Sequence, residues 1–204
     1  SLNRYRYSNH RPGMLSQAYI TGVKLTSKGD VIVSTLNGLN VYNRDTDTFT
    51  YIRQNNEMPD KSLNCNFINC LLTDNENIWV GTEIGGINLL TPNCLQTYVW
   101  QYNYLQETSL SPNPVNAISE DKDGNLWVGT VEGGLNKKSK GSDEFIHYTF
   151  DQNNPTSISN NSIRGILIDS ENHLWAYTWG VGINELNLNI PHNQTFQRHI
   201  REDS

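Results

Sequence analysis

Three tryptophans, Trp79, Trp127 and Trp175, recur at equal intervals of 48 residues. Each stands second from the apolar start of a short run that closes with threonine, and a glycine pair or its remnant follows. The run 78–82 is followed by Gly85-Gly86, the run 126–130 by Gly133-Gly134, and the run 174–178 by Gly180 and Gly182. A weaker copy, 31–35 followed by Gly38, precedes these three. A unit repeated at this length indicates one supersecondary element used several times.

Each copy divides into four short apolar or aromatic runs separated by turn residues. In the third copy the runs are 115–118, 126–130, 135–138 and 145–148. The Asp123-Gly124 step is a strong hairpin signal, and Gly133-Gly134 provides a second turn. No window of comparable length keeps the apolar period of a helix. Four strands in about 40–50 residues are typical of a propeller blade, so the sequence predicts an all-β fold.

The connections between copies repeat as well. Ser62-Leu63-Asn64, Ser109-Leu110-Ser111 and Ser157-Ile158-Ser159 each precede the next first run. We interpret them as crossings between blades, in which Leu or Ile is a buried peg. Each first run also contains a small residue at the same place: Gly22, Cys70, Ala117 and Gly165. This series predicts crowding where inner strands converge on the propeller axis, and the alternative is chance in strands of mixed side-chain size.

The expected architecture is a β-propeller segment of about four and a half four-stranded antiparallel blades. Its parts are a half blade at 1–12 and blades at 13–58, 59–108, 109–156 and 157–204. Propellers usually close with about four to eight blades, so we expect an incomplete propeller and a piece of a longer protein. The cut faces would then lack their apolar neighbours, which predicts self-association near residues 2–7 or 163–200.

Charge and cysteine content exclude several partners. The formal net charge is −6 and the basic residues are scattered, which argues against nucleic acid. No long apolar run is present, so we expect no membrane contact from this segment. Cys65 and Cys70 flank an extended run and point apart, and we expect no disulfide from these two or from Cys94.

No catalytic constellation, cofactor motif or metal site is expected. The histidines stand at no motif spacing to a nucleophile, and no phosphate loop occurs. Asp121, Asp123 and Asn125 could suggest calcium, but no bidentate Glu follows at loop spacing, so we interpret them as a turn. Glu120 and Asp121 could suggest a glycosidase pair, but adjacent strand residues face opposite sides.

One rim of the blades is the candidate binding surface. Turns between second and third strands share a face with the crossings into first strands. We expect this rim to carry Glu83, Glu132, Trp179, Tyr104, Asn113 and Asn161, with Asn69, Asn116 and Arg164 near the inner-strand entrances. Sugar sites combine a flat aromatic with planar polar groups. Trp179, Tyr177 and Arg164 form the best such cluster; the alternatives are Trp179 packing between blades and Arg164 in an inter-blade ion pair.

The segment 121–130, followed by Gly133-Gly134-Leu135-Asn136, resembles the two-component regulator propeller repeat, and 153–161 resembles that family's crossing between blades. The resemblance covers nearly the whole chain, most clearly in the last three copies. It implies a periplasmic sensor region of a hybrid two-component system of the Bacteroides type, with two propellers and a β-sandwich outside the inner membrane. A transmembrane helix, histidine kinase, receiver and DNA-binding domain would follow. The implied ligand is an oligosaccharide, and the implied assembly is a homodimer.

The sequence departs from the family pattern at both ends of the array. The first copy lacks the tryptophan and the paired glycine. The last copy has Ala176-Tyr177 where Val128-Gly129 stands, and Trp179 occupies the position of Glu83 and Val131.

Three classes of function remain after these exclusions. The first is a non-enzymatic ligand-sensing segment that biases a distant kinase. The alternatives are a protein–protein interaction propeller and a propeller lyase or hydrolase, which fold alone cannot separate. For any of them we expect Trp79, Trp127 and Trp175 to lie buried on second strands.

Overall fold

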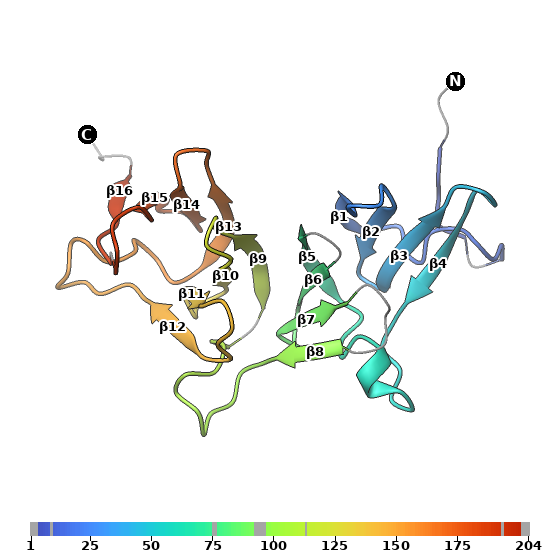
Figure 1. The fold of residues 1–204 in the computed structure, drawn as a ribbon, viewed down its shortest axis with the longest axis horizontal. Helices are drawn as coiled ribbons and strands as arrows, with labels where there is room; N and C mark the ends of the chain where they lie inside the picture. The colour runs from blue at the N-terminus through green and yellow to red at the C-terminus, as the bar shows by residue number, and fades with distance from the viewer. Residues whose placement is uncertain are drawn as a thin grey trace. The chain divides into compact units, whose positions relative to one another are not determined.

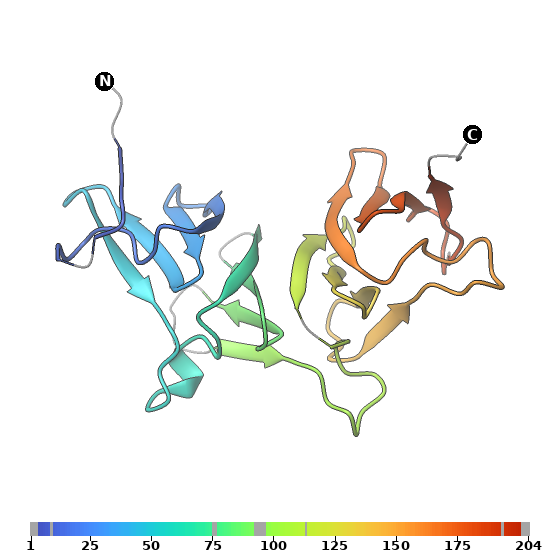
Figure 2. The same cartoon turned by 180° about the vertical axis from the view of Figure 1, so that it is seen from behind.

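The computed structural model describes residues 4–8, 10–74, 77–91, 97–112, 114–192 and 194–200. It contains four antiparallel sheets of four strands, and the strands of each follow one another in chain order (Figures 1 and 2). Sequence analysis therefore predicted the all-β blade architecture correctly. Blades 1 to 4 denote these sheets in chain order.

The chain forms two compact units, Ser1–Val99 and Trp100–Ser204. The first holds blade 1, with β1 (Ile20–Leu25), β2 (Val31–Thr35), β3 (Gly38–Asn43) and β4 (Thr48–Ile52), and blade 2, with β5 (Ile68–Asp74), β6 (Asn77–Thr82), β7 (Ile87–Leu90) and β8 (Thr97–Trp100). A short 3-10 helix, η1 (Pro59–Lys61), connects them.

The second unit holds blades 3 and 4. Blade 3 contains β9 (Val115–Glu120), β10 (Leu126–Thr130), β11 (Leu135–Lys138) and β12 (Phe145–Tyr148). Blade 4 contains β13 (Ile163–Ile168), β14 (His173–Thr178), β15 (Gly182–Asn187) and β16 (Gln197–His199).

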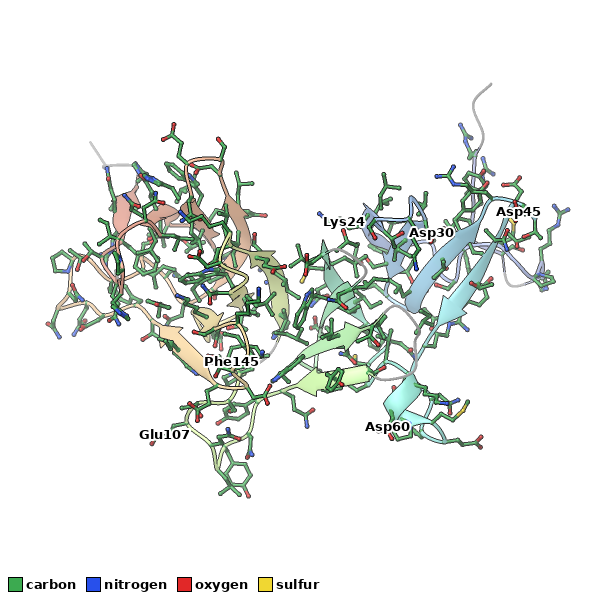
Figure 3. The ribbon with its side chains drawn as sticks, in the orientation of Figure 1. Lys24, Asp30, Asp45, Asp60, Glu107 and Phe145 are labelled. Carbon is green, nitrogen blue, oxygen red and sulfur yellow. The ribbon has the colours of Figure 1, made fainter. Side chains whose placement is uncertain are left out.

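The core of each unit lies between its two blades. In the second unit Trp127 and Leu135 of blade 3 pack with Ile163, Leu174 and other apolar residues of blade 4. The first unit has an equivalent core of Ile32, Leu39, Leu63, Ile68, Leu71, Val80 and Leu90. Among the side chains labelled in Figure 3, Phe145 is buried, whereas Lys24, Asp30, Asp45, Asp60 and Glu107 are exposed.

A fully buried asparagine fixes the third strand of every blade. Asn40, Asn88, Asn136 and Asn184 recur at intervals of 48 residues, each with no exposed surface. In blade 3, Asn136 Oδ1 accepts the backbone N–H of Ser111 at 3.1 Å, and Nδ2 donates to the Val128 carbonyl at 3.3 Å. The asparagine therefore ties the crossing segment to the second and third strands, and satisfies backbone groups that burial would otherwise leave without partners.

The crossings carry the predicted apolar pegs. Leu63, Leu110 and Ile158 are buried, with at most 1% of their surface exposed. A serine precedes each peg and closes the crossing: the Ser157 hydroxyl, for example, accepts the Asp151 N–H at 2.9 Å and donates to the Asp151 carbonyl at 3.1 Å.

All three repeated tryptophans lie on second strands, as predicted, but only Trp127 is fully buried. Trp79 and Trp175 are half-buried, so the predicted burial of these two is wrong. The reason is visible in the second unit, where blade 4 covers Trp127 and no sheet among the described residues covers Trp175 in the same way. In this unit, full burial of the tryptophan accompanies coverage by the following blade.

The predicted half blade at 1–12 forms no strand in its described part, 4–8 and 10–12. Tyr7 makes an isolated parallel bridge to Leu15, and the ring of Tyr5 packs edge-on against Tyr42 and Phe49. Residues 2 and 3, part of the predicted association surface, lie outside the described residues. Self-association stays a prediction.

Neither described cysteine, Cys65 or Cys70, belongs to a disulfide, and Cys94 lies outside the described residues. Cys65 is buried, and Cys70, a member of the small-residue series, is half-buried. Desolvation nevertheless raises the pKa of the Cys70 thiol to about 12. At Gly165, another member of the small series, a side chain would overlap the ring of Tyr177 in the same sheet.

Candidate functional site

A β-bulge interrupts the pairing of the first and second strands at the same place in every blade. The register shifts between Ile20 and Gly22, between Ile68 and Cys70, opposite Gly129/Thr130, and between Ile163 and Gly165. The residues passed over are Thr21, Asn69, Asn116 and Arg164. A bulge redirects a side chain away from the regular alternation of the strand. Three of these four residues were predicted site residues.

The residue that follows the threonine of each second strand lies beside this bulge. Glu83, Val131 and Trp179 each donate a backbone N–H, at 3.0 Å, to a carbonyl just before the inner strand. We call these residues, with Leu36 and the four bulge residues, the bulge rim. The backbone of the bulge rim repeats from blade to blade, whereas its side chains differ in each copy.

In two blades the paired side chains of the bulge rim touch. Asn69 Nδ2 donates to Glu83 Oε2 at 2.9 Å in blade 2. In blade 4 the Arg164 guanidinium lies over the Trp179 indole, 4.5 Å from the ring centre, in a cation–π contact. Arg164 therefore makes an aromatic contact rather than the inter-blade ion pair that was the alternative.

The predicted cluster of Arg164, Tyr177 and Trp179 belongs to a single blade. Tyr177 and Trp179 are 53% and 64% exposed, Tyr177 on β14 and Trp179 directly after it. The Tyr177 ring covers Gly165, where any side chain would overlap it. Both aromatic rings are thus held by their neighbours and remain open to solvent.

The other four predicted residues, Asn116, Glu132, Asn69 and Glu83, lie in blades 2 and 3. Asn116 donates from Nδ2 to the Ile163 carbonyl at 3.2 Å, which places it beside the inner strand of blade 4. Glu132 is exposed in the β10–β11 turn, with a left-handed φ of 64°. Asn69 and Glu83 belong to the first unit. The seven predicted residues therefore form two groups, one in each unit.

The Asp121 turn is organised by hydrogen bonds to N–H donors. Both carboxylate oxygens accept bonds from Asn125 Nδ2, and Oδ2 also accepts the Trp127 indole N–H at 2.9 Å. Asp169 bonds Trp175 in the same way at 2.8 Å, and the backbone N–H of His173 and this indole lower the pKa of Asp169. No group of three potential metal ligands was found among the described residues.

Two features of blades 3 and 4 were missed by sequence analysis. One is the asparagine series, whose signal was available as the 48-residue recurrence after each glycine turn. The other is a carboxylate between two imidazoles in blade 4: Glu185 lies 2.6 Å from His173 Nδ1 and 2.9 Å from His199 Nε2. Hydrogen bonds from His199 and His173 lower the pKa of Glu185.

Comparisons with known proteins identify the repeat. Residues 62–83 and 109–132 match the family model described as two component regulator propeller. The comparison with curated proteins gave no match. In the described part of the chain, no helix is long and apolar enough to cross a membrane.

Several solved structures resemble this chain. The extracellular domain of a hybrid two component system from B. thetaiotaomicron is 26% identical, with a TM-score of 0.69 over 84% of this chain and 22% of that one. A second such domain from the same organism is 21% identical, with a TM-score of 0.77 over 91% of this chain and 25% of that one.

A gluconolactonase from Xanthomonas campestris is 13% identical, with a TM-score of 0.62 over 89% of this chain and 61% of that one. At this identity the likeness concerns the fold alone. This chain spans about a quarter or less of the two extracellular domains.

Proposed function

We propose that this chain, which carries repeats of the two-component regulator propeller family, is a periplasmic saccharide-sensing segment of a hybrid two-component receptor. The likeness to extracellular domains of two such systems supports the receptor assignment. Binding of an oligosaccharide would bias a histidine kinase elsewhere in the parent protein, through the remaining blades and a homodimer.

The observation that carries the proposal is the Arg164–Trp179 pair on the bulge rim. A repeated backbone that presents different side chains in each blade suits recognition, because the scaffold stays fixed while the contact chemistry varies. In blade 4 this position offers two exposed aromatic rings, Tyr177 and Trp179, and a guanidinium. An aromatic face packs against the C–H face of a sugar ring, and the guanidinium N–H groups can donate to its hydroxyls.

The proposal assigns no catalysis to this segment. The bulge rim contains a carboxylate, Glu83, whose Oε2 accepts a hydrogen bond from Asn69, and this pair has no counterpart in blades 3 and 4. A bound oligosaccharide is therefore expected to be recovered intact after incubation with the protein, which chromatography of the ligand can check.

The test is a calorimetric titration of the chain with an oligosaccharide panel, comparing wild type with Trp179→Ala and Tyr104→Ala. Trp179→Ala should weaken binding of the best ligand by about tenfold or more, the effect of removing an aromatic anchor. Tyr104→Ala is the matched control: the sequence placed Tyr104 on the same rim, but in the structure it is 79% exposed in the same unit and belongs to none of the bulges that define the bulge rim. Equal affinities of wild type and Trp179→Ala for every ligand would contradict the proposal.

A further inference from the structure

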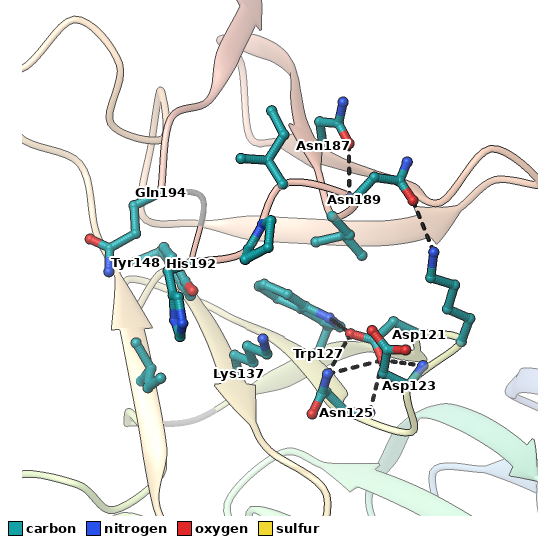
Figure 4. Close-up of a pocket in the computed structure, with 15 residues that line it drawn as sticks. Asp121, Asp123, Asn125, Trp127, Lys137, Tyr148, Asn187, Asn189, His192 and Gln194 are labelled. Atoms are coloured by element: carbon teal, nitrogen blue, oxygen red, sulfur yellow. Dashed lines mark hydrogen bonds between the residues drawn. The ribbon is translucent and has the colours of Figure 1, made fainter.

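A cavity of about 480 Å³ opens between blades 3 and 4, away from the bulge rim. One wall comes from blade 3, including the Asp121 turn, Trp127, Lys137 and Tyr148. The opposite wall is the β15–β16 connection, from Asn187 to His192 with Gln194 (Figure 4). All of these residues belong to the second unit, so the cavity lies within one compact body.

The two ends of this cavity differ in charge. Figure 4 shows Lys137, His192, Tyr148 and Gln194 toward one end and the Asp121 turn toward the other. Lys137 Nζ lies 5.2 Å from the centre of the Trp127 ring, and no carboxylate pairs with it in the described part of the chain. The ring attracts the ammonium from one side and leaves its N–H donors available to a ligand.

The two carboxylates at the opposite end of the cavity, Asp121 and Asp123, differ in burial and in their hydrogen bonds, and neither pairs with Lys137 in the described part of the chain. Asp121 is 7% exposed, and its two oxygens accept N–H groups from Asn125, Trp127 and the turn backbone. Asp123 is exposed on the same turn. The second lysine of the cavity, Lys122, donates to Asn189 Oδ1 at 2.9 Å, so it is held by an amide rather than an acid.

Amides complete the polar lining. Asn125, Asn187, Asn189 and Gln194 come from both walls of the cavity. Asn125 already bonds Asp121 and the Lys140 N–H, and Asn189 bonds Lys122 and the Glu171 carbonyl. An amide nitrogen carries two N–H groups and an amide oxygen two lone pairs, so Asn125 Oδ1 and Asn189 Nδ2 each keep capacity that matches the hydroxyls of a sugar. The rings of the buried Trp127 and the half-buried Tyr148 lie 5.6 Å apart, tilted by 34°, and give the cavity an apolar floor.

We propose that this cavity binds an anionic saccharide, with its carboxylate or sulfate held between Lys137 and His192 and its hydroxyls on the amides. The position corresponding to Lys137 is Val41, Leu89 and Glu185 in the other blades, so the amine is a feature of blade 3 alone. The proposal rests on the proposed function only for the premise that the chain binds saccharides, and it involves none of the bulge-rim residues.

The experiment follows Trp fluorescence and calorimetry during titration with three probes: trigalacturonate, a sulfated disaccharide and neutral galactotriose. Wild type should bind one of the anionic probes at least about tenfold more tightly than galactotriose, because hydrogen bonds to charged groups are stronger than neutral ones. The preference should fall as salt concentration rises.

Lys137→Gln should abolish the anionic preference, whereas Lys140→Gln should keep it. Lys140 is exposed in the β11–β12 turn outside the cavity, and only its backbone N–H bonds Asn125, so its substitution removes the same charge without touching the lining. Trp179→Ala should also keep the preference, which separates this site from the bulge rim. Equal affinities for charged and neutral probes, or an unchanged preference in Lys137→Gln, would overturn the inference.

Discussion

Blades 3 and 4 lie side by side in one unit and share their internal hydrogen bonds. They differ on one face, called the outer face here, which carries the repeated tryptophan and which in blade 3 packs against blade 4. Asn136 and Asn184 are both fully buried and make the same two bonds, to the crossing serine and to the second strand. The aspartate–tryptophan bond at the first hairpin is also common to both blades. The scaffold is therefore independent of what each blade packs against.

The outer faces differ at three positions along the strands. Where blade 3 has Gly129, Lys137 and Tyr148, blade 4 has Tyr177, Glu185 and His199. His199 stacks on Trp175 at 5.4 Å, and Tyr148 lies at a tilt against Trp127 at 5.6 Å. The aromatic pair is kept while its surroundings change from a covered face to an open one. Trp127, which blade 4 covers, is fully buried, whereas Trp175 is half-buried.

The largest expected effect concerns the shared scaffold. Asn136→Leu keeps the side-chain size but removes the partners of the Ser111 N–H and of the Val128 carbonyl. Each buried group left without a partner costs about 1–3 kcal/mol, so we expect a loss of roughly 2–5 kcal/mol in the free energy of unfolding. Urea denaturation measures it, and Asn184→Leu should lose a similar amount. A large loss in only one of the two variants would break the equivalence of the blades.

The second prediction concerns the difference between the outer faces. A side chain at Gly129 would overlap the side chain of Ile163 in blade 4, so Gly129→Ala should destabilise the chain by about 1–3 kcal/mol. Tyr177 occupies the same strand position in blade 4 and is 53% exposed, so Tyr177→Ala should change stability by no more than about 0.5–1 kcal/mol. Urea denaturation measures both losses. Equal losses would mean that another part of the protein packs against Tyr177 in solution, contrary to its 53% exposure in the structure.

The sequence was sufficient to predict the structural features that recur in every copy of the repeat. The spacing of Trp79, Trp127 and Trp175 predicted their strands, and the rim residues Asn69, Asn116 and Arg164 turned out to share a β-bulge. The bulge could not be predicted, because the residues at its position, Thr21, Asn69, Asn116 and Arg164, have no side-chain chemistry in common. The cavity beside Lys137 could not be predicted, because its second wall comes from the following blade and from a connection that does not repeat.

The smallest expected effect is a pH dependence confined to blade 4. The pKa of Glu185 is lowered by hydrogen bonds from His199 and His173. A carboxylate whose pKa is lower in the folded than in the unfolded state stabilises the fold above about pH 4.3, its unfolded value, and this contribution is lost as the pH falls through the folded value. The corresponding residue of blade 3 is Lys137, which carries no such dependence in acid.

Glu185→Gln should therefore lower Tm at pH 6 to 7 by about 1–2 °C, the scale of a partly exposed polar contact, and this difference from wild type should shrink as the pH falls below about 4.3. Asp47 and Asp169 also have lowered pKa values, so every variant should lose stability in acid, and the informative quantity is the difference between variant and wild type. Lys137→Gln serves as the control, because its Tm difference from wild type should stay constant over the same range. A Glu185→Gln difference that does not shrink on acidification would show that the two histidines do not stabilise this carboxylate, and would remove one of the contrasts between the blades.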